Sequence, residues 1–255
     1  LPMTSPPPRK RPSPGRSSRP TAAGRDEPPA APPHPPITLV VGTDTDVGKT
    51  WVTAAVARAL KELGQQVIAV KPIETGCGEE PNSEEDGARL ATATGQSGPR
   101  RSLVRLPGRV APAIAADQAG IVLDYDDLVA RIRSLAAPDT LLLVEGSGGL
   151  LTPLTWTDNH LDLAHSLESR VLLVAADRLG TLSHTLLALR VLQAERIPVL
   201  GIVLNQVDAA DQSTRTNAAA LVRLAEQVPV VTVPRLADPA RAAEALKEVA
   251  GWLLP

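Results

Sequence analysis

The nine residues from Gly42 to Thr50 have the types and the order that bind the phosphates of a nucleotide. They read GTDTDVGKT. Gly48, Lys49 and Thr50 open a predicted helix, so several free backbone N–H groups can converge on an anion at its N-terminus. Lys49 would bring a positive charge to the β- and γ-phosphates, and the Thr50 hydroxyl can bind Mg²⁺. The run therefore predicts binding of Mg-ATP.

The spacing of this loop departs by one residue from the general phosphate-loop pattern. Five residues separate Gly42 from Gly48, where the pattern has four, and Thr43 stands at the place of the usual first glycine. An ordinary strand-to-helix turn rich in Asp and Thr is the alternative. The intact GKT and the predicted order of strand, loop and helix favour the phosphate loop.

Two charged residues follow other predicted strands. Lys71 comes directly after the second strand, in VKPIETGC, and Pro72 restricts the turn that aims it over the carboxyl edge of the sheet. Glu145 follows the apolar run LLLV and precedes the glycine-rich GSGG. A carboxylate beside the phosphate loop suits Mg²⁺, which prefers oxygen ligands. The alternatives are a solvated strand-end lysine and a structural turn residue.

Three further residues are harder to assign from their types alone. Asp86, in NSEEDGARLA, is either functional or one of three acids placed at a helix N-terminus to suit its dipole. Asn205 ends the run VLGIVLN and can pair with an adenine edge or cap a turn. His184 is a lone histidine on a predicted helix, where packing or solvation is the commoner role.

Strand and helix patterns alternate along the chain from residue 37. Short apolar runs, typical of strands buried on both faces, alternate with amphipathic stretches. This order predicts one α/β domain of the P-loop NTPase type, with a mostly parallel sheet and helices on both faces. The expected strands are residues 37–42, 67–70, 141–144, 171–175, 199–204 and 230–233, and the expected helices are residues 50–63, 84–93, 125–135, 182–194, 214–227 and 239–252.

The first 36 residues differ in composition from the rest. They hold 13 of the 25 prolines, with six basic and two acidic residues, which predicts a disordered, proline-rich accessory tail before a domain of residues 37–255. The net charge of −2 minus the tail's +4 leaves −6 for that domain. An acidic domain disfavours a nucleic-acid or membrane partner. A single cysteine, Cys77, and no apolar run of about 20 residues predict a cytoplasmic protein.

The blocks GTDTDVGKT, KPIETG, VEGSGGLLTPL, LGTLSHT and VPRL, in this order, resemble the dethiobiotin synthetase family across residues 37–236. The family reads GTDTxVGKT, which accounts for Thr43. The resemblance implies a homodimer that uses Mg-ATP and CO₂ to convert 7,8-diaminopelargonic acid into dethiobiotin, ADP and phosphate. No nucleophilic side chain is needed for this chemistry.

The resemblance also implies roles for individual residues. Lys49 and Lys71 would be catalytic, and Thr50, Asp86 and Glu145 would bind the metal, so that the resemblance favours function for Asp86. The nucleotide would contact Asp46, Val47, Gly48, Lys49, Thr50, Trp51, Asp86, Glu145, Gly146, Gly148, Asn205, Pro234, Arg235 and Leu236. The substrate would contact Thr45, Lys71, Thr75, Leu179, Gly180, Thr181 and Ser183, of which the segment around Ser183 comes from the partner subunit.

Two features depart from the family pattern. Ser183 stands where the family has Asn, and its shorter side chain would leave the contact with the substrate carboxylate to water or to nearby backbone. The proline-rich tail is also outside the pattern.

The alternatives are an amide synthase acting on a corrinoid precursor, which normally carries a glutaminase domain, and a nucleotide-switch ATPase of the partitioning type. The second needs a lysine where this chain has Thr43 and Asp44.

Overall fold

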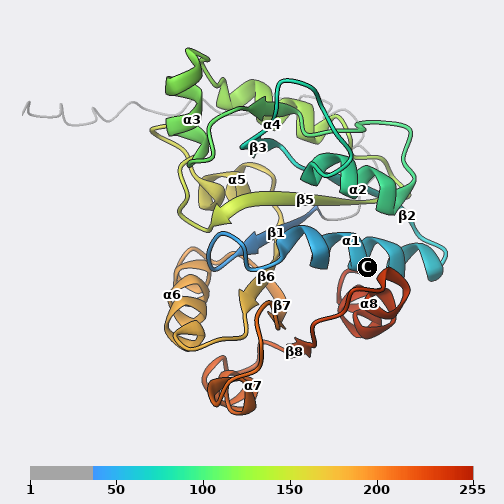
Figure 1. The fold of residues 1–255 in the computed structure, drawn as a ribbon, viewed down its shortest axis with the longest axis vertical. Coiled ribbons are helices and arrows are strands. Elements are labelled where there is room, and N and C mark those ends of the chain that lie inside the picture. Colours follow the sequence, from blue (N-terminus) through green and yellow to red (C-terminus); the bar gives the residue numbers. More distant parts are fainter. Residues whose placement is uncertain (1–36, 255) are drawn as a thin grey trace, which may run out of the picture. The chain divides into compact units, whose positions relative to one another are not determined.

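The computed structural model describes residues 37–254, so the predicted proline-rich tail lies outside the described residues. Six parallel strands form the central sheet in the order β2-β5-β1-β6-β7-β8 (Figure 1). The strands are β1 (Thr38–Gly42), β2 (Gln66–Val70), β5 (Thr140–Gly149), β6 (Arg170–Ala176), β7 (Val199–Asn205) and β8 (Val230–Val233).

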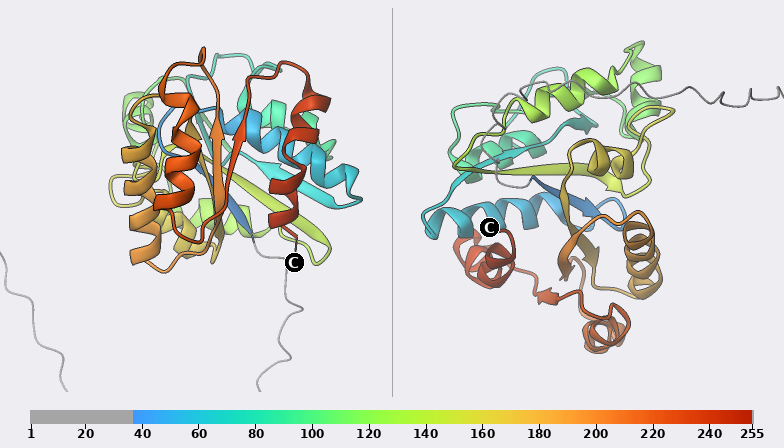
Figure 2. Two further views of the ribbon diagram at one scale, coloured as in Figure 1. Left: turned by 90° about the horizontal axis from the view of Figure 1, so that it is seen from below. Right: turned by 180° about the vertical axis from the view of Figure 1, so that it is seen from behind.

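Helices cover both faces of this sheet because alternate side chains of each strand point to opposite faces. Val40 packs on one face with α1, and its neighbours Leu39 and Val41 pack on the other. Figure 2 shows α1 and α8 on one side of the strands and α6 and α7 on the other. The first face carries α1 (Lys49–Glu62), α2 (Asp86–Thr94), α8 (Pro239–Ala245) and α9 (Lys247–Trp252), and the second carries α3 (Pro112–Ala119), α4 (Tyr125–Arg133), α5 (His160–Ser166), α6 (Thr181–Ala194) and α7 (Asn217–Leu224).

The predicted fold class and the six predicted strands are confirmed, and most predicted helices are present. The helix expected over residues 239–252 is interrupted at Leu246, whose φ of −108° and ψ of 12° are not helical. The helix expected over residues 214–227 is a 3-10 turn, Ser213–Arg215, followed by the shorter α7. Helices α3 and α5 were not predicted, nor was a small parallel sheet of β3 (Ile73–Thr75) and β4 (Val104–Leu106).

The start of helix α5 is marked in the sequence by a capping box, which the pattern of apolar residues does not reveal. Asn159 accepts hydrogen bonds from the N–H groups of Leu161 and Asp162, and the Asp162 carboxylate accepts one from Asn159 N–H. This reciprocal capping box satisfies backbone donors that a helix start leaves free. With only seven residues, α5 is too short for a clear helical period.

The register of the sheet brings the chemistry-bearing residues to one edge. Val70 of β2 pairs with Val144 of β5, so Lys71 and Glu145 stand side by side one residue further on. The carboxyl end of β1, which leads into the phosphate loop, lies next to β5. Among residues 37–254, none of the helices combines the length and apolarity needed to cross a membrane.

Candidate active site

The loop after β1 has the backbone conformation of a phosphate cradle. Gly48, at the N-cap of α1, has a φ of 87°, and Asp46 has a φ of 57°. This positive φ favours glycine at position 48. A Cβ there would also lie 2.1 Å from Asn205 Nδ2, so there is no room for a side chain. Lys49 is buried and donates from Nζ to the Asp44 carbonyl oxygen at 2.9 Å. The loop therefore folds around its own lysine.

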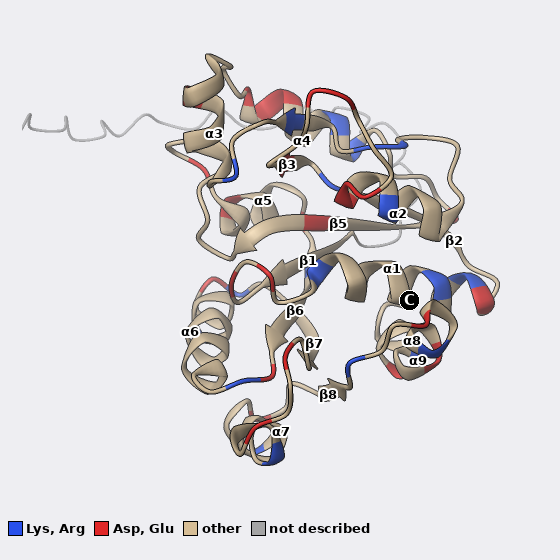
Figure 3. Ribbon diagram, viewed as in Figure 1, with Lys and Arg blue, Asp and Glu red and all other residues tan. Residues whose placement is uncertain are grey.

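One lysine and two carboxylates form the centre of the site. Lys71 Nζ donates to Glu145 Oε1 at 2.7 Å and to Asp86 Oδ2 at 2.8 Å. Thr50 Oγ1 donates to the same Glu145 oxygen at 2.7 Å. Glu145 is fully buried, and within the described residues its Oε2 has no hydrogen-bond partner. Figure 3 shows the acidic segment of β5 and the basic start of α1 close together.

The pKa values of the two lysines are shifted in opposite directions. Burial and the nearby charge of Lys71 lower the pKa of Lys49 to about 8. Burial also lowers the pKa of Lys71, but the charges and hydrogen bonds of Glu145 and Asp86 outweigh this effect and hold the pKa above its ordinary value. Lys71 therefore carries a permanent charge at neutral pH, whereas Lys49 is poised to gain or lose a proton.

A cavity of about 710 Å³ lies in front of these groups. Lys49, Thr50, Lys71 and Asp86 are in its wall, together with further residues expected to contact nucleotide or substrate. Those further residues are Thr45, Asp46, Gly48, Trp51, Thr75 and Gly148. The structure thus brings about half of the predicted site residues to a single cavity.

The remaining predicted residues lie outside that cavity wall. Asn205 is buried behind the loop and donates from Nδ2 to the Val47 carbonyl at 3.0 Å. A second cavity of about 290 Å³ is lined by Trp51, Ala237 and Pro239, and so adjoins the segment expected to hold adenine. That segment, Pro234–Leu236, and the start of α6, Leu179–Ser183, do not line the larger cavity.

His160 was missed by the sequence analysis, although it supports the glycine-rich end of β5. It is buried, accepts the Ser147 N–H at Nε2 at 2.9 Å, and its Nδ1 lies 3.1 Å from the Gly149 carbonyl oxygen. These partners require a neutral ring with the proton on Nδ1. Burial and the charges of Lys49 and Lys71 lower its pKa to about 3.

We expect His160 to make folding stability depend on pH. Its folded pKa of about 3 lies below the unfolded value of about 6.5, so the unfolded state binds more protons between these values. Stability is therefore full above pH 6.5 and falls by about 1.4 kcal/mol per pH unit below it. Urea unfolding at pH 7, 6 and 5 measures this loss.

The matched variant is His160→Gln, whose amide can still accept from Ser147. It should be less stable at pH 7 by about 1 kcal/mol and lack this component of the pH dependence. The same slope in both proteins between pH 6 and 5 would show that His160 does not stay neutral in the folded state.

The sheet order, the loop and its lysine define a P-loop NTPase. The AAA domain family matches residues 38–242. The fold is also that of a ParA family ATPase from Chlorobium tepidum, with a TM-score of 0.53, 14% identity, and coverage of 87% of this chain and 98% of that one.

Sequence similarity identifies the family within this class. The chain is 39% identical to the ATP-dependent dethiobiotin synthetase of Anaeromyxobacter dehalogenans over 83% of its own length and 95% of the relative. It is 41% identical to that of Caulobacter sp. strain K31, over 78% and 88% of the two chains. The chain belongs to the family of ATP-dependent dethiobiotin synthetases, ligases of biotin biosynthesis that form C–N bonds, as the sequence motifs predicted.

The pKa of Lys49 predicts that nucleotide binding is linked to proton uptake. Phosphates stabilise the charged ammonium, so above pH 8 the protein must take up a proton when ATP binds. We expect affinity for a non-hydrolysable ATP analogue to fall as pH rises above 8, by up to about tenfold per unit. Calorimetry at pH 8.5 in buffers of different ionisation enthalpy measures the uptake. Equal heats in all buffers at pH 8.5 would contradict the prediction.

Proposed function

We propose that this chain carboxylates 7,8-diaminopelargonic acid with CO₂ and closes the product to dethiobiotin, with cleavage of Mg-ATP to ADP and phosphate. The observation that carries this proposal is the buried Lys71 ammonium at the wall of the cavity that also contains the phosphate loop. Family membership supplies the substrate.

The reaction asks for charge stabilisation more than for covalent catalysis. One amine of the substrate adds to CO₂ and loses a proton, and an oxygen of the resulting carbamate attacks the γ-phosphorus as the bond to ADP breaks. The second amine then attacks the carbonyl carbon, and phosphate leaves as the five-membered urea closes. Negative charge builds up on the carbamate and phosphoryl oxygens, which Lys71 and Lys49 can stabilise from fixed positions.

The residues around Lys71 suit a magnesium ion. Thr50, Asp86 and Glu145 offer one hydroxyl and two carboxylates, which is the oxygen set that Mg²⁺ prefers. The buried Glu145 Oε2 has no hydrogen-bond partner among the described residues. A bound cation would supply the missing partner of this oxygen. We propose that these three residues hold the ion, which when bound would neutralise charge on the β- and γ-phosphates.

A homodimer would complete the substrate site. Leu179 and Ser183 are exposed at the start of α6, and Leu179 has 83% of its surface accessible. Leu151 and Leu187 are also exposed, at 58% and 65%. We propose that these apolar side chains are covered by the second subunit, which brings its α6 start to the cavity. Sedimentation velocity should give a dimer, and a fully active monomer would contradict this arrangement.

The deciding experiment supplies ATP, Mg²⁺, labelled bicarbonate and 7,8-diaminopelargonic acid to the full chain. We expect acid-stable label in a cyclic urea, with one ADP formed per product. Binding of ATP without any labelled product would refute the proposed reaction.

A nucleotide switch of the partitioning type is the rival that the fold permits. Its loop lysine is absent, since Thr43 and Asp44 stand at the corresponding positions, and the Asp44 carboxylate lies 3.6 Å from Arg178. Basic and acidic residues are interspersed over the described elements in Figure 3. Hydrolysis of ATP that rises with DNA or lipid vesicles, and not with the diamine plus bicarbonate, would favour the rival.

We further propose that residues 37–255 form the catalytic domain and that the first 36 residues are accessory. Deletion of residues 1–36 should leave the turnover number and the KM for the diamine unchanged, because the cavity is built from residues 45–153. Steady-state kinetics of both proteins checks this. A large loss of activity on deletion would assign the tail a part in the reaction.

A further inference from the structure

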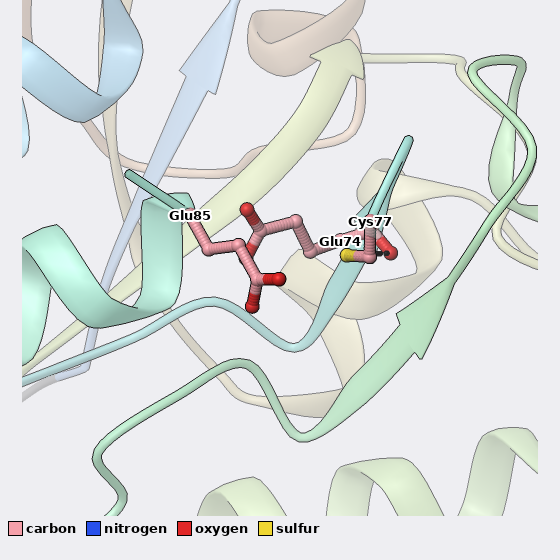
Figure 4. A group of neighbouring side chains, drawn as sticks. All are labelled: Glu74, Cys77 and Glu85. Atoms are coloured by element: carbon pink, nitrogen blue, oxygen red, sulfur yellow. Dashed lines mark hydrogen bonds between the residues drawn. The ribbon is translucent and has the colours of Figure 1, made fainter. Parts of the chain in front are cut away.

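A cluster of three buried side chains lies beside the active site. Glu74, Cys77 and Glu85 bring one ligand atom each within 4.8 Å of one another. Figure 4 shows the three side chains. Each of the three has its own partners. Glu85 forms a salt bridge with Arg105, and the Cys77 thiol donates to the Glu74 carbonyl oxygen at 3.6 Å. The Glu74 carboxylate bonds instead to the start of α2.

The Glu74 carboxylate caps α2 from another element. Its Oε1 accepts the Asp86 N–H at 2.6 Å, and its Oε2 accepts the Gly87 N–H at 3.1 Å and the Ser102 hydroxyl at 2.9 Å. The N-cap residue of the helix, Glu85, makes no side-chain capping bond. Glu74 thus satisfies two backbone donors that the helix start leaves free, and its negative charge suits that end of the helix.

These bonds fix the backbone of one particular active-site residue. Asp86 is held at its N–H by Glu74, while its carboxylate reaches Lys71 Nζ at 2.8 Å. Gly87 packs directly against the backbone of Ser102, where a Cβ would lie 2.1 Å from Ser102 N. The start of α2 can therefore shift little without breaking the bonds to Glu74.

Glu74 also connects this helix to the part of the cavity expected to face the substrate. It lies on β3 directly before Thr75, and both residues are in the cavity wall. The segment that bears Thr75 and the segment that bears Asp86 are thus joined through one buried carboxylate.

We propose that Glu74 is a positioning residue, which holds the Asp86 carboxylate where it can serve Mg²⁺ and Lys71. The proposal rests on the function proposed above, in which Asp86 is a metal ligand. Both carboxylate oxygens of Glu74 already accept hydrogen bonds from the start of α2 and from Ser102, so its proposed role is to hold the backbone of Asp86.

The test is Glu74→Gln in the full chain, which keeps one acceptor oxygen and removes the second acceptor and the charge. In the absence of metal and nucleotide, amide hydrogen exchange at Asp86 and Gly87 should become at least about tenfold faster. The Mg²⁺ concentration for half-maximal binding of a non-hydrolysable ATP analogue should rise about tenfold, as when an outer-shell partner is lost. Binding of the analogue without Mg²⁺ should not change.

Glu85→Gln is the matched control because it removes a carboxylate of the same cluster that faces Arg105. It should leave the Mg²⁺ dependence at the wild-type value.

A second test combines Glu74→Gln with Asp86→Asn, where we expect no further rise in the Mg²⁺ requirement beyond that of Asp86→Asn alone. If Glu74→Gln does not fold, Ser102→Ala, which removes one bond to Glu74, should shift the Mg²⁺ requirement in the same direction by a smaller factor.

An unchanged Mg²⁺ dependence in Glu74→Gln, or in Ser102→Ala where the first does not fold, would overturn the proposal. So would a Glu74→Gln effect that persists in full on the Asp86→Asn background. Binding of the analogue and exchange of the amides do not depend on the substrate. Failure of the carboxylation assay would therefore refute the proposed reaction and leave this test valid.

Discussion

Replacing Lys71 by Gln is expected to lower turnover by at least about a hundredfold, the loss typical for removal of one preorganised electrostatic group. The amide cannot carry the charge that faces the carbamate. Nucleotide binding should be spared, because the phosphates are held by Lys49 and the loop N–H groups. Turnover is measured by labelled bicarbonate incorporation and binding by calorimetry.

The same change should also destabilise the protein. Glu145 is fully buried, and loss of its lysine leaves a buried carboxylate without its cation, which costs about 3–5 kcal/mol. Mg²⁺ with the ATP analogue should restore more stability to the variant than to the wild type, since the ion replaces the missing charge. Urea unfolding with and without the ligands measures both effects.

Two control variants separate charge from position. Lys71→Arg keeps the charge and should retain most of the stability, but its planar donors cannot reproduce the ammonium contacts, so turnover should still fall. Lys247→Gln removes an exposed lysine paired with Glu244 and should change neither quantity. Wild-type turnover in Lys71→Gln would remove Lys71 from the mechanism.

Replacing Glu145 by Gln is expected to have the second-largest effect. One Glu145 oxygen already accepts from Thr50 and Lys71, and the other is buried without a partner among the described residues. The variant puts a weakly coordinating amide into the proposed metal site. We expect the Mg²⁺ requirement to rise at least about tenfold and turnover at limiting Mg²⁺ to fall by at least the same factor.

Titration of Mg²⁺ at saturating ATP measures this shift. Affinity for the analogue in the absence of Mg²⁺ should not fall, because the variant removes a negative charge and keeps the cationic groups that face the phosphates. Asp86→Asn provides a graded comparison, since the Asp86 side chain is 32% exposed and should have the smaller effect of the two. A wild-type Mg²⁺ dependence in Glu145→Gln would exclude this residue as a metal ligand.

The choice among the acidic residues at the start of α2 illustrates what residue types alone cannot decide. Glu84, Glu85 and Asp86 are adjacent, and each suits a helix N-terminus equally well. The tertiary structure separates them: Glu84 pairs with the exposed Arg89, Glu85 pairs with Arg105, and Asp86 pairs with Lys71. Each of these partners lies on a different segment, so the pairing depends on how the chain folds.

His160 is a similar case. Its position in NHLD signals a helix start, but nothing near it in sequence indicates that its ring will support the glycine-rich end of β5. The two segments meet because the chain turns back after β5, and this contact spans 13 residues. A lone histidine is uninformative until its neighbours are known.

The phosphate loop, the six strands of the main sheet and the family could be predicted from the sequence because each depends on local patterns. A loop that joins a buried strand to a helix and ends in GKT needs few contacts from elsewhere, and parallel strands buried on both faces have a recognisable composition. The pairing of Lys71 with Glu145 and Asp86, the cap that Glu74 provides and the neutral state of His160 were decided only by the tertiary structure. These features arise from contacts between segments that are distant in sequence, and burial then sets the charge that each group can carry.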